Sequence, residues 1–173
     1  MQFKTALISA AAMLVMAGPA AAAGAPTDPQ IAHIAYTAGT IDIAAGKQAL
    51  AKSHNKTIRS FAEEMVRDHT AVNDKALALV KKLHVTPAPN PTSASLTKQA
   101  NETKARLGHL KGAAFDRAYI DNEVAYHKTV NGALESTLIP NAKNAELKSL
   151  LQTGLTLFRE HQAHAEQVAK ELK

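Results

Sequence analysis

The chain has 173 residues but no cysteine and no tryptophan, and aromatic residues make up only 4% of it. Without cysteine, neither a disulfide nor a catalytic thiolate is available. The scarcity of aromatic rings argues against a surface on which sugars or nucleic-acid bases would stack. No stretch of useful length alternates apolar and polar residues as a strand does. These absences leave an all-α domain without covalent cross-links.

An excess of charge is also missing, because 20 basic residues face 15 acidic ones. The lysines are scattered, and the longest basic run is Lys81-Lys82. We therefore expect no nucleic-acid partner. The chain has no P-loop, no dinucleotide-binding fingerprint and no G-x-S-x-G motif, so we expect no organic cofactor and no activated nucleophile.

The first 23 residues have the pattern of a secretory signal peptide. Lys4 supplies the positive charge, residues 5–17 are apolar, and an alanine run offers cleavage after Ala22 or Ala23. The apolar part is too short to span a membrane. We therefore expect export to the periplasm, a single domain over residues 24–173, and no transmembrane segment in the mature chain.

Apolar residues recur every three to four positions in five later segments, which predicts helices. The expected ranges are 28–52, 55–84, 93–107, 113–138 and 144–172. Asp28 suits the N-cap of the first helix, ahead of Pro29, and Pro140 is expected to end the fourth. The proline-rich residues 86–92 form a loop. Four long helices predict an antiparallel four-helix bundle, and the short helix stands where a ferritin-like bundle has its crossover.

Polar residues interrupt the apolar faces of these helices. Asp68 lies in the apolar seam of the second helix with His69 beside it, and His161 lies in the middle of the last seam. Buried carboxylates and imidazoles are costly unless something pairs with them, so these residues suggest one shared site. Its candidates are Asp42 (on the flank of the first helix, beside Ile41), Asp68, His69, Glu123, His127 and His161.

Oxygen and nitrogen ligands held on facing helices suit a transition metal such as iron, zinc, copper or manganese. A ferritin-type di-iron centre needs two Glu-x-x-His pairs. No aspartate or glutamate here is followed by histidine three residues later. We therefore expect a mononuclear or irregular site that is richer in histidine.

Five of these candidates also have a purely structural interpretation. Glu123 and His127 are four residues apart and can form a weak pair on a half-exposed face. His161 can be a neutral core histidine that is hydrogen-bonded to Tyr119 or Tyr126. The arginines that could pair with Asp68 and His69 are Arg67, Arg117 and Arg159. The adjacent pair Glu63 and Glu64 is expected to face solvent.

These interpretations leave two functions open beside metal binding. In one, the protein is a metal-free stress or interaction scaffold whose polar residues form a closed hydrogen-bond network, with an unidentified protein partner. In the other, it carries an apolar ligand or lipid in a groove that the small residues of the first helix leave against the second.

Three segments, FAEEMVRDHTAVN, FDRAYIDNEVAYHKTV and FREHQAHAEQ, resemble the secreted bacterial family called domain of unknown function 4142. The resemblance covers residues 28–172. It implies a ferritin-like helical bundle and no settled activity. Asp42 stands where the family's glutamate is expected on the first helix. The matching positions are Asp68, His69, Asp116, Tyr119, His127 and His161.

Overall fold

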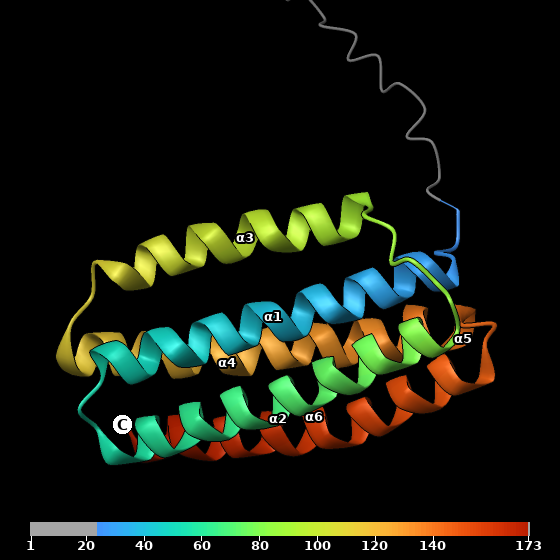
Figure 1. Ribbon diagram of the computed structural model, residues 1–173. Helices are drawn as coiled ribbons and strands as arrows, with labels where there is room; N and C mark the ends of the chain where they lie inside the picture. Colours follow the sequence, from blue (N-terminus) through green and yellow to red (C-terminus); the bar gives the residue numbers. More distant parts are fainter. Residues whose placement is uncertain (1–23, 173) are drawn as a thin grey trace, which may run out of the picture.

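The computed structural model describes residues 24–172 (Figure 1), and the expected signal peptide lies outside them. Helices make up most of the described part, which contains no strand, as the apolar periodicity predicted. Its helices are α1 (Asp28–Lys52), α2 (Lys56–Lys82), α3 (Pro91–Gly108), α4 (Gly112–Ala133), the π-helical turn η1 (Leu134–Leu138), α5 (Ile139–Asn141) and α6 (Ala145–Glu171). Within residues 24–172, no helix is both long enough and apolar enough to cross a bilayer.

Four long helices lie side by side, and α3 runs along the outside of α1 (Figure 1). A short link joins α1 to α2, and α3 carries the chain back along the bundle before α4 begins. As a result α2 and α4 run in one direction while α1 and α6 run in the other. Around the bundle α1 packs on α2, α2 on α6, α6 on α4 and α4 on α1, so neighbouring helices are antiparallel.

Asparagine side chains start two of the long helices. Asn55 Oδ1 accepts hydrogen bonds from two backbone N–H groups at the start of α2, and Asn144 does the same for α6. The prediction for α1 was wrong by one residue, because Thr27 is its N-cap. The carboxylate of Asp28 instead accepts the N–H groups of Lys143 and Asn144, and so joins the start of α1 to the start of α6.

The sequence predicted that the fourth helix would end before Pro140. In the structure the helix continues to Asn141. The five residues of η1 widen the helix into a π-turn, and the N–H of Ile139 reaches back five residues to the carbonyl of Leu134. Proline usually breaks a helix because it lacks an N–H and its ring clashes with the carbonyl four residues earlier. The π-turn shifts the hydrogen-bond register and so lets the helix pass Pro140.

The helices α1 and α2 approach closely at Gly46. A β-carbon there would lie 2.8 Å from Val66 Cγ2 and 3.0 Å from the carbonyl oxygen of Ala62. The Val66 methyl group and the Ala62 carbonyl leave no room for a side chain at Gly46, so a larger residue there would push the two helices apart. The close approach brings Asp42, one turn before Gly46, against α2.

The core has two apolar clusters. The first, which we call the Phe61 cluster, includes Ala49, Ile58, Phe61, Met65, Tyr119 and Val168. The second, the Leu151 cluster, runs from Ile31 to Phe158 and includes Leu134 and Leu151. Buried polar residues on all four long helices lie between the two clusters in the chain order of each helix.

Two expectations about helix faces are wrong. Asp42 is buried and lies in the seam of α1, whereas Ile41 is only half-buried. On α2 the buried face runs through Met65, His69 and Asn73, and Asp68 lies at its edge. Both differences are rotations of about 100° around a helix axis, the angle between adjacent residues.

Candidate metal centre

The buried polar layer takes side chains from each of the four long helices. Asp42 comes from α1, His69 from α2, Glu123 and His127 from α4, and His161 from α6. None of the five residues is more than 3% exposed. The structure therefore brings together five of the six residues that the sequence suggested.

Asp42 lies at the centre of this layer. Its Oδ2 is 3.2 Å from Nε2 of His69 and 3.4 Å from Nε2 of His127. Glu123 Oε2 lies 3.8 Å from Nδ1 of His127. One ligand atom from each of Asp42, Glu123 and His127 falls within 4.8 Å of the other two, a spacing that a single ion could bridge.

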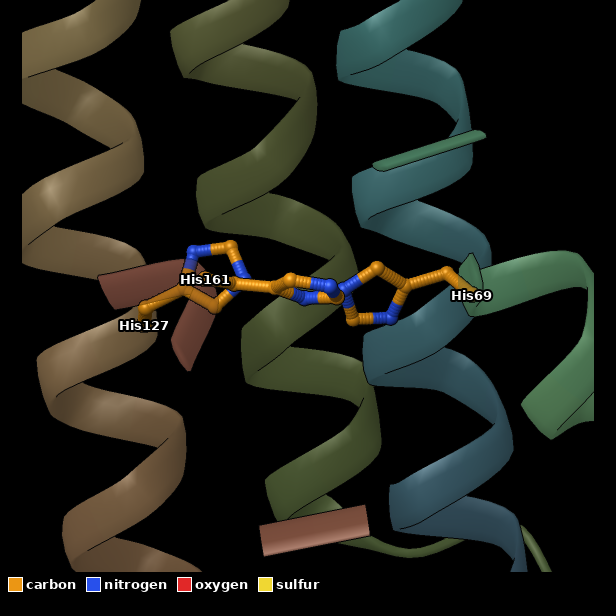
Figure 2. A group of neighbouring side chains, drawn as sticks. All are labelled: His69, His127 and His161. Carbon is orange, nitrogen blue, oxygen red and sulfur yellow. The ribbon is translucent and has the colours of Figure 1, made fainter. Parts of the chain in front are cut away.

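The three histidines approach one another from three helices. Figure 2 shows the rings of His69, His127 and His161 turned toward a common region. Their centroids lie 5.4 to 5.7 Å apart, and one nitrogen from each lies within 4.8 Å of the others. Phe158 stacks on the ring of His69 at 4.6 Å, which holds that imidazole in place.

The backbone sets which nitrogen of His127 faces the layer. Nδ1 of His127 lies 3.0 Å from the carbonyl oxygen of Glu123 and can donate to it only when it carries the proton. In the neutral ring, Nε2 then presents a lone pair toward the Asp42 carboxyl group. A metal-binding histidine is held in the same way, with its second nitrogen donating to a carbonyl.

Several atoms of the layer lack hydrogen bonds. Among the described residues, both carboxyl oxygens of Asp42, both ring nitrogens of His69 and Nε2 of His127 have no hydrogen-bond partner. Buried polar atoms in folded proteins are rarely left this way. These atoms leave the hydrogen-bond network of the layer incomplete within residues 24–172.

The distances from Asp42 to His69 and to His127 can be compared with those between two ligands of one cation. Ligands about 2.0–2.1 Å from a tetrahedral ion lie roughly 3.3–3.4 Å from one another. The 3.2 Å and 3.4 Å separations from Asp42 to the two histidines are close to that value. An ion between these atoms would supply the interaction that they lack.

Burial favours the neutral form of both the histidines and the carboxyl groups in the layer. It lowers the pKa of His69 to about 3 and that of His127 to about 4, and it also lowers the pKa of His161. It raises the pKa of Asp42 to about 7 and holds the pKa of Glu123 well above its usual range. Neutral imidazoles are ready to act as ligands, whereas a cation would have to displace the protons on the carboxyl groups.

Asp68, the sixth candidate, lies at the rim of the layer. Its Oδ2 is 3.1 Å from Nε2 of His161, and Arg67 donates to both of its oxygens. The hydrogen bond from Arg67 is the main reason that the pKa of Asp68 is lowered. His161 is therefore paired with an aspartate and not with Tyr119 or Tyr126, as the alternative had it.

The other proposed partners are engaged elsewhere. Arg117 pairs with Asp121, and Arg159 pairs with Glu135. The hydroxyl of Tyr126 donates to the carbonyl of Ala38 at 2.8 Å. Of the three arginines considered, Arg67 alone is paired with Asp68 in the described residues.

The sequence interpretation missed two residues beside the layer, Glu64 and His164. Glu64 was expected to face solvent, but it is half-buried, and its Oε2 lies 2.7 Å from Nδ1 of His164. A signal was available, because Glu64 lies one turn before Asp68 and His164 one turn after His161. Glu64, Asp68 and His161 form a third group whose ligand atoms lie within 4.8 Å of one another.

An apolar cavity of about 480 Å³ lies on the other side of the layer. On each long helix its lining includes a residue one turn from the layer, such as Ala38, Asn73, Val130 and Phe158. Its wall also includes residues of the Leu151 cluster, such as Ile34, Leu134 and Leu151, and the start of α3 at residues 90–92. The sequence suggested a groove between α1 and α2, but all four long helices line this space.

Comparison with known proteins yields a family and no characterised relative. The family described as "Domain of unknown function (DUF4142)" matches residues 14–168, which is most of the chain. No curated protein and no solved structure matches the chain.

Proposed function

The chain belongs to the DUF4142 family, whose description names no activity, and we propose that the protein binds a divalent transition-metal ion in its core. The ligands are His69, His127 and His161, with Asp42 and Glu123 completing the site. The observation that carries the proposal is the contact of Asp42 with two histidines at 3.2 Å and 3.4 Å, between buried atoms that have no hydrogen-bond partner within residues 24–172.

The proposal includes a ferritin-like arrangement of the bundle. In such bundles, all four helices send metal ligands inward and one long crossover joins the two helix pairs. Here α3 lies in the connection between the pair α1–α2 and the pair α4–α6. The antiparallel neighbours and the ligands on every long helix support the same conclusion.

The residues of the layer favour one ion over a ferritin-type pair. Two Glu-x-x-His motifs would require carboxylates three residues before His69 and His161, and those positions hold Val66 and Phe158. Three imidazoles and two carboxyl groups suit zinc, copper, iron or manganese better than calcium or magnesium, which prefer oxygen ligands. With the expected signal peptide, we place this site in the periplasm, in metal handling or defence against oxidants.

The test is the metal content of the protein. The untagged chain, expressed with its own leader and purified without chelator, is expected to hold about one transition-metal ion, as measured by elemental mass spectrometry. The double variant His127→Ala/His161→Ala should hold none. His54→Ala is the matched control, because His54 is exposed in the link between α1 and α2 and should leave the metal content unchanged.

The proposal is wrong if the wild-type protein is purified without metal and does not bind iron, zinc, copper or manganese in titration. Circular dichroism of the double variant shows whether the bundle is retained. Metal loss in a folded variant supports the site, and full metal content in that variant assigns the ion elsewhere.

The apolar cavity supports a second candidate function, the binding of an elongated apolar molecule such as a fatty acid. Its volume of about 480 Å³ falls in the range of small-molecule sites, and its lining is largely aliphatic. Organic extraction and mass spectrometry should find copurified lipid in the wild type and less in Ala35→Phe, which fills the cavity. Ala44→Phe, on the exposed side of α1, is the control. Absence of lipid from the wild type, together with no binding of added fatty acid, would rule this function out.

A further inference from the structure

The proposed metal centre has no direct access to solvent through its own ligands. Asp42, Glu123, His127 and His161 are each 1% exposed, and His69 is 3% exposed. A hydrated ion must exchange its water ligands for protein ligands before it reaches such a site. Polar side chains at the surface of the layer would lower the cost of that exchange.

A second group of polar side chains lies at one edge of the layer, between α2 and α6. It consists of Glu64 and Asp68 from α2 and His161 and His164 from α6. One ligand atom from each of Glu64, Asp68 and His161 lies within 4.8 Å of the other two. His164 joins the group through its 2.7 Å contact with Glu64.

Exposure decreases in steps across this group. The side chain of His164 is 39% exposed, that of Glu64 28%, that of Asp68 18% and that of His161 1%. His161 belongs both to this group and to the cluster with His69 and His127. The buried ring of His161, whose Nδ1 has no hydrogen-bond partner among the described residues, therefore links the two groups.

We propose that Glu64, Asp68 and His164 form an uptake site that captures a divalent transition-metal ion from solvent and delivers it to the core ligands through His161. The proposal rests on the proposed function, because it assigns the route to that centre. It is independent of the apolar cavity, whose lining includes none of these residues.

The contacts of the group suit transient binding. Phe61 packs its ring edge-to-face against His164 at 5.2 Å, which positions the imidazole at the surface. Arg67 occupies both oxygens of Asp68 and opposes a cation there. The Arg67 side chain is 69% exposed, and exposed ion pairs contribute little, so the arginine can yield to an arriving ion. Because these ligand atoms also have hydrogen-bond partners in the protein, they should bind a metal ion briefly and release it again.

The test compares the rate of metal loading with the amount bound at the end. Cobalt(II) is mixed with metal-free protein, and its absorption is followed by stopped flow. The double variant Glu64→Gln/His164→Gln should load about tenfold more slowly than the wild type, since it loses the local charge and the ligands that concentrate cations at the surface. The final stoichiometry and the Kd should not change.

Two variants keep the test interpretable. Glu63→Gln, at an exposed neighbouring position on α2, should load at the wild-type rate. The single variant Glu64→Gln preserves the shape of the contact with His164 and should show a smaller delay, which controls for misfolding of the double variant.

Each contrary outcome has a distinct meaning. An unchanged loading rate in the folded double variant overturns the uptake site while leaving the core site intact. Loss of final stoichiometry shows that Glu64 and His164 hold the resident ion, which also overturns it. If wild-type protein binds neither cobalt nor the four metals named above, the proposed function itself fails, and the route to that centre fails with it.

Discussion

The Phe61 cluster and the polar layer are equally buried, yet their effects on stability are opposite. Met65 and His69 lie one turn apart on the same face of α2, at 0% and 3% exposure. Met65 removes apolar surface from water, which stabilises the fold. His69 loses its hydration, and neither of its ring nitrogens has a hydrogen-bond partner in the part of the chain that the structure describes. Burial alone therefore does not indicate whether a residue serves the fold or a site.

The ends of the bundle also differ in how well they are filled. Most residues of the Phe61 cluster are completely buried, whereas the Leu151 cluster borders the cavity of about 480 Å³. A densely packed end fixes the positions of the ligands one turn away, and a loosely packed end leaves room for a ligand. Four experiments test these contrasts.

The largest effect is expected in the Phe61 cluster. Phe61→Ala should lower the free energy of unfolding by about 3–5 kcal/mol, because it removes a fully buried ring and leaves a void. Urea denaturation followed by circular dichroism measures the loss. The loss should be the same with and without chelator, and a strong chelator dependence would show that Phe61 acts through the metal centre.

In the polar layer, by contrast, the free energy of unfolding should depend on chelator. With free zinc at a hundred times the Kd, binding adds about 2.7 kcal/mol to the free energy of unfolding, and chelator should remove that gain. Thermal unfolding with and without chelator tests this. The His127→Ala/His161→Ala variant should not respond to chelator. A wild-type protein that is equally indifferent would support the scaffold interpretation.

A matched pair of alanines compares the packing of the two ends. Ala62 is completely buried in the Phe61 cluster, and Ala62→Val should cost about 1–3 kcal/mol through overpacking. Ala35 borders the cavity, and Ala35→Val should change stability by less than about 0.5 kcal/mol, as at a site with room for the added methyl groups. Equal losses at the two positions would mean that the cavity is not available space.

The smallest effect concerns the pH dependence of the metal-free protein. The pKa of Asp42 is raised to about 7 in the folded state from 3.8, so the folded chain keeps a proton that the unfolded chain releases. Its contribution to stability is present at low pH and is lost as the pH rises through 7. Between pH 6 and 8, wild type should lose about 1.4 kcal/mol relative to Asp42→Asn, which cannot titrate. A constant difference between the two would contradict the raised pKa.

The histidines of the layer affect stability in the opposite sense: they destabilise the fold as the pH falls below about 6.5. The pKa of His69 is lowered to about 3 and that of His127 to about 4, from 6.5. The unfolded chain therefore takes up protons first as the pH falls from 6.5 toward 3, and this favours unfolding. Asp42→Asn retains both histidines, and its comparison with wild type also includes Glu123, whose pKa is raised by burial and in part by the charge of Asp42.

Much of the site was visible in the sequence because helical periodicity marks polar residues that interrupt an apolar face. His127 and His161 were identified in this way, and both are buried in the layer. Asp42 was placed beside the face, since Ile41 is the more apolar neighbour. Glu64 was missed because an acidic residue next to another glutamate is usually exposed, and only its contact with His164 on α6 shows otherwise.

The amino-acid sequence alone predicts the helices, the proline loop, the polar residues available to the core and the lack of a Glu-x-x-His pair. Those features depend on neighbours within a few residues along the chain. The rotation of each helix about its axis, which turns His69 inward and leaves Asp68 at the rim, is visible only in the folded bundle. The tertiary structure also pairs Asp68 with His161, 93 residues away. Packing against neighbouring helices sets that rotation, and a single helical pattern does not contain it.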